Sequence, residues 1–169
     1  WVEYEWRWRQ ENWAVREFSQ PRWDGRDLQG QTILLYAEQG LGDTIQFIRY
    51  AAWVKAKGGR VMAEVAKSLL PLLQSCPGVD EWVAQGQPLP AFDTHAPLMS
   101  LPRLLNLTAI PAPVPYLQAS PDRPWQVDPT QFNIGIVWAG NPDHKNNRLR
   151  SCDLALFHPL LDLPGVALY

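Results

Sequence analysis

Short apolar runs and helical patterns alternate along the middle of the chain. The runs at residues 32–37, 60–66 and 79–84 predict buried strands, because each is rich in residues that favour β-structure. Between them, apolar residues recur every three or four positions over residues 43–57, and a shorter helical pattern covers residues 68–76. This order of strand, helix, strand, helix and strand requires right-handed crossovers between parallel strands. The pattern therefore predicts a doubly wound, Rossmann-like α/β fold.

Weaker patterns extend this unit at both ends. Residues 1–18 place Trp1, Tyr4, Trp8 and Val15 near one face of a helix, so we expect a helix that packs against another helix or against the following domain. Beyond the third strand, residues 92–95 predict a strand end, and residues 100–105 predict a helix that Pro102 opens.

A second unit follows a proline-rich stretch. Ten of the sixteen prolines fall between Pro88 and Pro129, which favours an extended linker there. A buried strand is expected at residues 133–139, a helix at 154–161 and a further strand at 166–169. These elements resemble the opening of a second α/β unit.

Composition excludes several classes of protein. A length of 169 residues suits one domain or slightly more, and a net charge of −2 argues against a dedicated nucleic-acid binder. Two cysteines without ligand spacing are expected to be reduced thiols in a cytoplasmic protein. No apolar stretch approaches about 18 residues, so we expect no membrane span. Because the chain opens on Trp1 and stops at Tyr169 within an expected strand, we expect a fragment of a larger protein.

The first candidate site is the glycine-containing turn after the first strand, EQGLGDT at residues 38–44. Gly40 and Gly42 allow a ligand to approach the backbone and the helix amides. The turn is not a dinucleotide fingerprint, since Ile45 stands where the third glycine would be, and no Lys-Ser/Thr pair follows as in a phosphate-binding P-loop. Asp43 has two interpretations: a helix cap, or a general base at the mouth of a cleft.

The second candidate site is the polar loop at residues 140–150. Lys145, Arg148 and Arg150 concentrate three positive charges between a strand and a helix, which suits a phosphate or diphosphate; the alternative is a solvated basic loop. His95 follows a strand end and could line the same cleft, although a lone histidine there is more often structural. No metal-ligand cluster and no Ser-His-Asp arrangement is visible in the sequence, so neither a metal nor a cofactor is expected.

Several segments together resemble one protein family. They are ILLYAEQGLGDTIQFIRYA, FDTHAPLMSLP, PAPVPYL and IGIVWAGNPDHKNNRLRS. In this order they are similar to the glycosyltransferase-like domain at the C-terminus of bacterial tetratricopeptide-repeat proteins. That domain is itself similar to the ADP-heptose:lipopolysaccharide heptosyltransferases of glycosyltransferase family 9. The opening WVEYEWRWR resembles the last repeat-like helix before such a domain.

This resemblance implies a GT-B architecture, in which two Rossmann-like lobes face each other across a cleft. Asp43 matches the aspartate that serves as catalytic base, and Lys145 is the closest match to a lysine on the donor diphosphate, with Arg148 and Arg150 as helpers. The expected binding residues are completed by Gly40, Gly42, His95 and Asn141. The implied reaction transfers a sugar from a nucleotide-diphosphate sugar to an unidentified protein or glycan acceptor, without a metal.

The resemblance also sets the expected domain boundaries. Residues 1–24 would end a repeat region, residues 25–110 would form the N-terminal lobe, residues 111–132 would be the linker, and residues 133–169 would begin a truncated C-terminal lobe. Because a complete lobe needs roughly a hundred residues, we expect the fragment alone to be inactive. Two rival hypotheses stay open: a non-catalytic interaction module of a repeat protein, with partners reached through upstream repeats, and a generic nucleotide-binding Rossmann protein.

Overall fold

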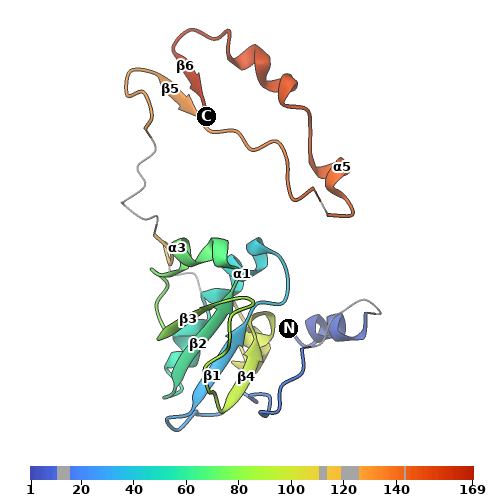
Figure 1. Ribbon diagram of the computed structural model, residues 1–169, viewed down its shortest axis with the longest axis vertical. Helices are drawn as coiled ribbons and strands as arrows, with labels where there is room; N and C mark the ends of the chain where they lie inside the picture. The colour runs from blue at the N-terminus through green and yellow to red at the C-terminus, as the bar shows by residue number, and fades with distance from the viewer. Residues whose placement is uncertain (11–15, 111–113, 119–125, 143) are drawn as a thin grey trace. The chain divides into compact units, whose positions relative to one another are not determined.

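The computed structural model describes residues 1–10, 16–110, 114–118, 126–142 and 144–169 (Figure 1). The chain divides into two compact units, Trp1–Ser120 and Pro121–Tyr169, which are described separately.

A four-stranded parallel sheet forms the centre of the first unit, as the hydrophobic pattern predicts. Its order is β3-β2-β1-β4. The strands are β1 (Thr32–Tyr36), β2 (Arg60–Val65), β3 (Glu81–Ala84) and β4 (Thr94–Pro97). The molecule is therefore an α/β protein, and this strand order is the one that opens Rossmann sheets.

Short helices follow strands β1, β2 and β4. They are α1 (Leu41–Ile48), α2 (Ala51–Lys55), η2 (Lys67–Leu69), α3 (Leu70–Leu73), η3 (Leu98–Ser100) and α4 (Leu101–Leu104), where η denotes a 3-10 helix. The continuous helix predicted over residues 43–57 is instead broken at Arg49 and Tyr50 into α1 and α2. Pro71 and Pro102 lie in the first turns of α3 and α4, where the missing amide costs no helical hydrogen bond.

The two faces of the sheet are covered differently. Alternate residues of β1 point to opposite faces, so Ile33 and Leu35 join the main core while Leu34 joins a smaller one. The main core contains the buried side chains of the helices, whereas the smaller core is covered by Phe18, Leu89 and Phe92 from segments without helices. The doubly wound prediction is wrong in this respect, because the connection from β3 to β4 (residues 85–93) contains no helix.

The N-terminal segment differs from the predicted helix. Only Glu3–Arg9 is helical, as the 3-10 helix η1; residues 11–15 of the predicted helix lie outside the described residues, and residues 16–18 are not helical. Further along, the backbone bonds to the outer edge of β4: His95 N donates to Pro21 O at 3.2 Å, and Trp23 N donates to His95 O at 2.8 Å. Those bonds satisfy the exposed sheet edge, which a helix could not do.

The second unit contains a two-stranded parallel sheet of β5 (Phe132–Ile134) and β6 (Val166–Leu168). The buried strand predicted over residues 133–139 is wrong beyond Ile134, and Val137 is 91% exposed. A parallel strand is buried only when both of its faces are covered, and a two-stranded sheet does not provide that cover. The helix expected at residues 154–161 is the 3-10 helix η4 (Leu154–Leu160), since Pro159 removes an interior amide donor.

Two glycines with the same backbone conformation allow a matched test of packing in the first unit. Gly78 and Gly86 have φ of +91° and +86°, but a Cβ on Gly78 would lie 2.5 Å from the backbone nitrogen of Ala52, whereas a Cβ on Gly86 would meet nothing within 4 Å. We predict that Gly86→Ala lowers the free energy of unfolding by about 1–2 kcal/mol through backbone strain alone. Gly78→Ala should cost at least about 1–3 kcal/mol more, because the chain must also shift at Ala52.

Urea unfolding of both variants measures this difference. Equal losses of unfolding free energy in the two variants would contradict the close packing of the turn at Gly78 on α2.

Candidate functional site

The turn between β1 and α1 places an acidic side chain at the carboxyl edge of the sheet. Gly40 is extended (φ −64°, ψ 171°) and precedes the first residue of α1, and its carbonyl accepts hydrogen bonds from the Thr44 amide at 3.1 Å and the Thr44 hydroxyl at 3.2 Å. A Cβ on Gly40 would lie 3.5 Å from Oδ2 of Asp43, and one on Gly42 would meet nothing within 4 Å. The turn therefore leaves open space around Gly42 and brings Gly40 and Asp43 together.

Asp43 lies in the first turn of α1 and is half-buried. No side chain caps this helix by a hydrogen bond, so the capping interpretation of Asp43 is wrong. Its carboxylate lies at the N-terminal, positive end of the helix dipole, where a negative charge is stabilised. Burial raises the pKa of Tyr4, and the nearby Asp43 carboxylate raises it further. Tyr4 is 40% exposed and stacks on Phe47 of α1 at 6.1 Å between ring centroids.

The sheet has a topological switch point between β1 and β4. In open α/β sheets, ligands bind in the crevice at the carboxyl ends of the strands where the strand order reverses. Here β1 continues through α1 to β2 on one side, while β4 lies on its other side. Glu38 follows β1 at this place, and Met99 and Ser100 follow β4.

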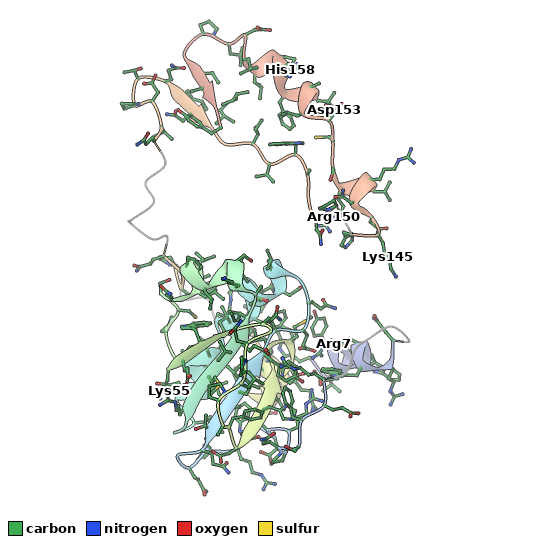
Figure 2. The ribbon with its side chains drawn as sticks, in the orientation of Figure 1. Arg7, Lys55, Lys145, Arg150, Asp153 and His158 are labelled. Atoms are coloured by element: carbon green, nitrogen blue, oxygen red, sulfur yellow. The ribbon has the colours of Figure 1, made fainter. Side chains whose placement is uncertain are left out.

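The Arg7 side chain of η1 fills this position, at the junction of η1 and the sheet (Figure 2). Its Nε and Nη2 donate to Oε1 of Glu38 at 3.2 and 3.1 Å, and Nη2 also donates to Oγ of Ser100 at 2.6 Å. The amide of Met99 donates to Oε2 of Glu38 at 3.2 Å. Arg7 and Glu38 are both buried, with side-chain exposures of 5% and 3%. Burial raises the pKa of Glu38, and Arg7 offsets this only in part.

A second carboxylate adjoins this pair. Oε1 of Glu5 accepts hydrogen bonds from Nη1 of Arg7 at 2.9 Å and from Oγ of Ser100 at 2.8 Å. Nη2 of Arg22 lies 3.1 Å from the same Ser100 oxygen. Burial alone would raise the pKa of Glu5, but the hydrogen bonds from Arg7 and Ser100 outweigh burial and hold that pKa below its ordinary value. We call Arg7, Glu38, Glu5, Ser100 and Arg22 the switch-point cluster.

His95 lies apart from the turn that carries Asp43. It is an interior residue of β4, opposite Leu34, and is 7% exposed. Its ring packs against Phe18 at 4.6 Å and Tyr36 at 5.8 Å between centroids. Burial lowers the pKa of His95, and its Nδ1 has no hydrogen-bond partner among the described residues. These contacts give His95 a packing role on the sheet face.

The basic loop belongs to the second unit. Lys145, Arg148 and Arg150 are exposed, the last two within the four-residue helix α5 (Asn147–Arg150). Figure 2 shows Lys145 and Arg150 on this loop. The amide of Gly140 donates to Ser151 Oγ at 3.3 Å, and the carbonyl of Asn141, itself exposed, accepts from the His144 amide at 3.1 Å. The loop thus presents three cations to solvent from a hydrogen-bonded turn.

Sequence patterns did not single out the switch-point cluster as a site. Glu38 and Ser100 stand inside the quoted segments AEQGLGD and MSLP, but nothing local distinguishes them as partners. Arg7 pairs with Glu38 across 31 positions of sequence, and such a pairing leaves no periodic signal. The buried Glu64 of β2, bound by Arg16, is a second ion pair of the same kind.

Comparison with known proteins adds no assignment: no family model, no curated protein and no solved structure matches the chain. Among the described residues, no three His, Cys, Asp or Glu side chains come together as a metal site. In that same part of the chain, every helix is too short or too polar to cross a membrane.

We predict that Arg7→Met destabilises the docking of η1 strongly. Removing the guanidinium leaves the Glu38 carboxylate buried without its counterion, which costs up to about 3–5 kcal/mol. Arg9→Met is the matched control, because Arg9 is exposed on the same helix and only covers the Trp6 ring, with its Cζ 4.2 Å from the ring centroid. Arg9→Met should destabilise the docking of η1 by less than about 1 kcal/mol. Amide hydrogen exchange in η1 measures both effects, and equal exchange rates in the two variants would refute the role of the buried pair.

The lowered pKa of Glu5 predicts how the free energy of unfolding depends on pH. Because its folded-state pKa lies below its ordinary value, Glu5 stabilises the folded chain fully above about pH 4.3 and loses this contribution as the pH falls. The difference in unfolding free energy between wild type and Glu5→Gln should therefore shrink from about pH 5 to about pH 3. Urea titrations at several pH values measure it. Glu3→Gln, an exposed change on the same helix, should keep the wild-type pH slope; a Glu5→Gln slope identical to wild type would contradict the assignment.

Proposed function

We propose that the chain is the acceptor-side lobe and the beginning of the donor-side lobe of a GT-B glycosyltransferase similar to the heptosyltransferases. The reaction transfers a sugar from a nucleotide-diphosphate sugar to a protein or glycan acceptor, in the cytoplasm of a bacterium. The proposal rests on the ordered motifs of the sequence, and one structural observation supports it best.

That observation is the position of Asp43. It stands in the first turn of the helix that follows the central strand β1, it is partly exposed, and no cap hydrogen bond ties a side chain to this helix end. Loops at the carboxyl edge of a parallel sheet are where α/β proteins bind ligands. A carboxylate there can accept the proton of an acceptor hydroxyl as the hydroxyl attacks the sugar. The open space around Gly42 leaves room for such an approach.

The basic loop supports the donor half of the proposal. A departing nucleoside diphosphate carries negative charge, and fixed cations stabilise this charge in the transition state. Lys145, Arg148 and Arg150 are exposed on one loop, and Arg side chains form paired hydrogen bonds with phosphate oxygens. In this proposal, Lys145 contacts the diphosphate directly, the two arginines assist it, and Asn141 lies in the same loop.

A second candidate function is a non-catalytic interaction module of a tetratricopeptide-repeat protein. Its specific support is the set of exposed apolar side chains in and just before η1. Val2 and Trp6 are 68% and 56% exposed, and Trp1 and Tyr4, which also contact Phe47, are 38% and 40% exposed. Contiguous exposed apolar side chains mark interaction surfaces. In this alternative, upstream repeats would share that surface with partner proteins, and the basic loop would be a solvated turn.

The decisive test is the Asp43→Asn variant of the full-length protein, assayed for transfer from a panel of sugar nucleotides. We predict a fall in kcat of about 10²–10⁴-fold with little change in the KM of the donor, because the change removes a base but no donor contact. Lys145→Gln should instead weaken donor binding. Asp27→Asn is the matched control, because Asp27 is an exposed aspartate near the opposite ends of the strands.

Unchanged turnover in Asp43→Asn would remove Asp43 from the mechanism. Absence of both transfer and sugar-nucleotide binding in the wild-type protein would favour the interaction module, and substitution of Trp6 should then weaken partner binding.

A further inference from the structure

Several donors converge on the single carboxylate of Glu5. Oγ of Ser100 donates to Oε1 at 2.8 Å, Nη2 of Arg22 lies 3.5 Å from Oε2, and Nε of Arg103 lies 3.8 Å from the same oxygen. The indole Nε1 of Trp8 donates to Oε2 at 3.2 Å. Glu5 itself retains 18% side-chain exposure. Nη1 of Arg7 also donates to Oε1 at 2.9 Å, so one carboxylate is held by three guanidinium groups, a hydroxyl and an indole.

Three of these donors belong to the sheet side of the contact and not to η1. Arg22 lies on the extended segment bonded along β4, Ser100 ends η3, and Arg103 lies in α4. All three therefore belong to segments that adjoin or follow β4, and Arg22 and Ser100 meet at its carboxyl end, beside the topological switch point. The anion comes from η1, together with the donors Arg7 and Trp8.

The charges show which anion balances which cation. Arg7 forms ion pairs with Glu38, which it contacts with two nitrogens, and with Glu5, whose Oε1 lies 2.9 Å from Nη1. Among the described residues, Glu5 is the carboxylate that forms ion pairs with both Arg22 and Arg103. The side chains of these two arginines are 41% and 44% exposed, so solvent ions can reach them. Without Glu5, Arg7 would keep Glu38 as its counterion, whereas Arg22 and Arg103 would have no ion-pair partner among the described residues.

We propose that Arg22, Ser100 and Arg103 form an anion-binding subsite for a phosphate or carboxylate group of a ligand, and that Glu5 of η1 occupies it as an intramolecular substitute. The chemistry fits such a group, because guanidinium forks and a hydroxyl donor are the usual partners of phosphate and carboxylate oxygens. The subsite is independent of the proposed sugar transfer, since it uses neither Asp43 nor the basic loop.

Two properties of the cluster support this role. Hydrogen bonds from Arg7, Ser100 and Trp8 hold the pKa of Glu5 below its ordinary value although burial opposes ionisation, so this place stabilises negative charge. A tethered carboxylate also competes at an effective concentration that reaches millimolar or more for short connections. A free anion must therefore bind strongly enough to compete with this effective concentration before it displaces Glu5. In this way η1 excludes anions that bind weakly.

Glu5→Gln tests the subsite, since it removes the competing charge and keeps the side chain's shape. The probe is inorganic phosphate, titrated at low ionic strength into the whole chain and followed by NMR of the Trp8 indole N–H and of the amide of Ser100. We predict that Glu5→Gln binds phosphate about tenfold or more tightly than wild type, which corresponds to about 1.4 kcal/mol. Glu3→Gln, its neighbour on η1, should bind as wild type does.

A double variant shows whether the named arginines make the subsite. Glu5→Gln combined with Arg103→Gln should lose the gain, whereas Glu5→Gln combined with Arg26→Gln should keep it, because Arg26 is 88% exposed and pairs with Asp24 instead. If Glu5→Gln loosens η1, the subsite opens further and the predicted gain is retained. Glu5→Ala serves as a second variant with the same expectation.

Acetate in place of phosphate distinguishes the two ligand groups: tighter binding of phosphate points to a phosphorylated ligand, and equal binding points to a carboxylate. The proposal is overturned if phosphate affinity is the same in wild type, Glu3→Gln and Glu5→Gln, or if the Arg103 double variant keeps the gain. None of these outcomes depends on sugar transfer, so failure here leaves the proposed function untouched, and the reverse also holds.

Discussion

The buried ion pair between Arg7 and Glu38 is the contact on which the arrangement of the first unit's site depends. Both side chains are almost fully excluded from water, and Glu38 also accepts a hydrogen bond from the Met99 amide. Two buried charges are stable together only if their geometry satisfies them, and each is costly without the other. The pair therefore fixes η1 against the carboxyl ends of β1 and β4, and this position determines which parts of the crevice remain open.

The position of η1 has two consequences for chemistry. On one side, the Asp43 carboxylate lies near enough to Tyr4 to raise the pKa of Tyr4, and Asp43 stays partly exposed, so the candidate base remains accessible. On the other side, the Glu5 carboxylate accepts a hydrogen bond from Ser100 and occupies the proposed anion subsite. One short 3-10 helix thus leaves one half of the switch point open while it fills the other. Such helices have poor hydrogen-bond geometry and depend on their tertiary contacts, which here include the ion pairs of Arg7 and Glu5 and the stacking of Tyr4 on Phe47.

The sequence predicts the sheet well and the site only in part. Strand β1 follows from a continuous apolar run, because burial on both faces needs no polar alternation. Strand β2 follows from a largely apolar run whose Glu64 is buried and paired with Arg16. The break at Arg49 and Tyr50 does not follow, because the apolar spacing continues across it. The aromatic spacing of residues 1–18 predicts an α-helix, whereas the described part of this segment contains the 3-10 helix η1 and the non-helical residues 16–18. His95 shows the opposite limit: its place at a strand end suggested a ligand residue, yet tertiary packing against Phe18 buries it.

The coupling energy between Arg7 and Glu38 tests this account most directly. A double-mutant cycle of Arg7→Met and Glu38→Gln, followed by urea unfolding and by hydrogen exchange in η1, isolates that energy from the separate costs of each change. The account predicts a coupling of about 2–3 kcal/mol, with the double variant less destabilised than the sum of the single variants. A coupling below about 0.5 kcal/mol would mean that η1 does not depend on this pair, and would contradict the central role given to it.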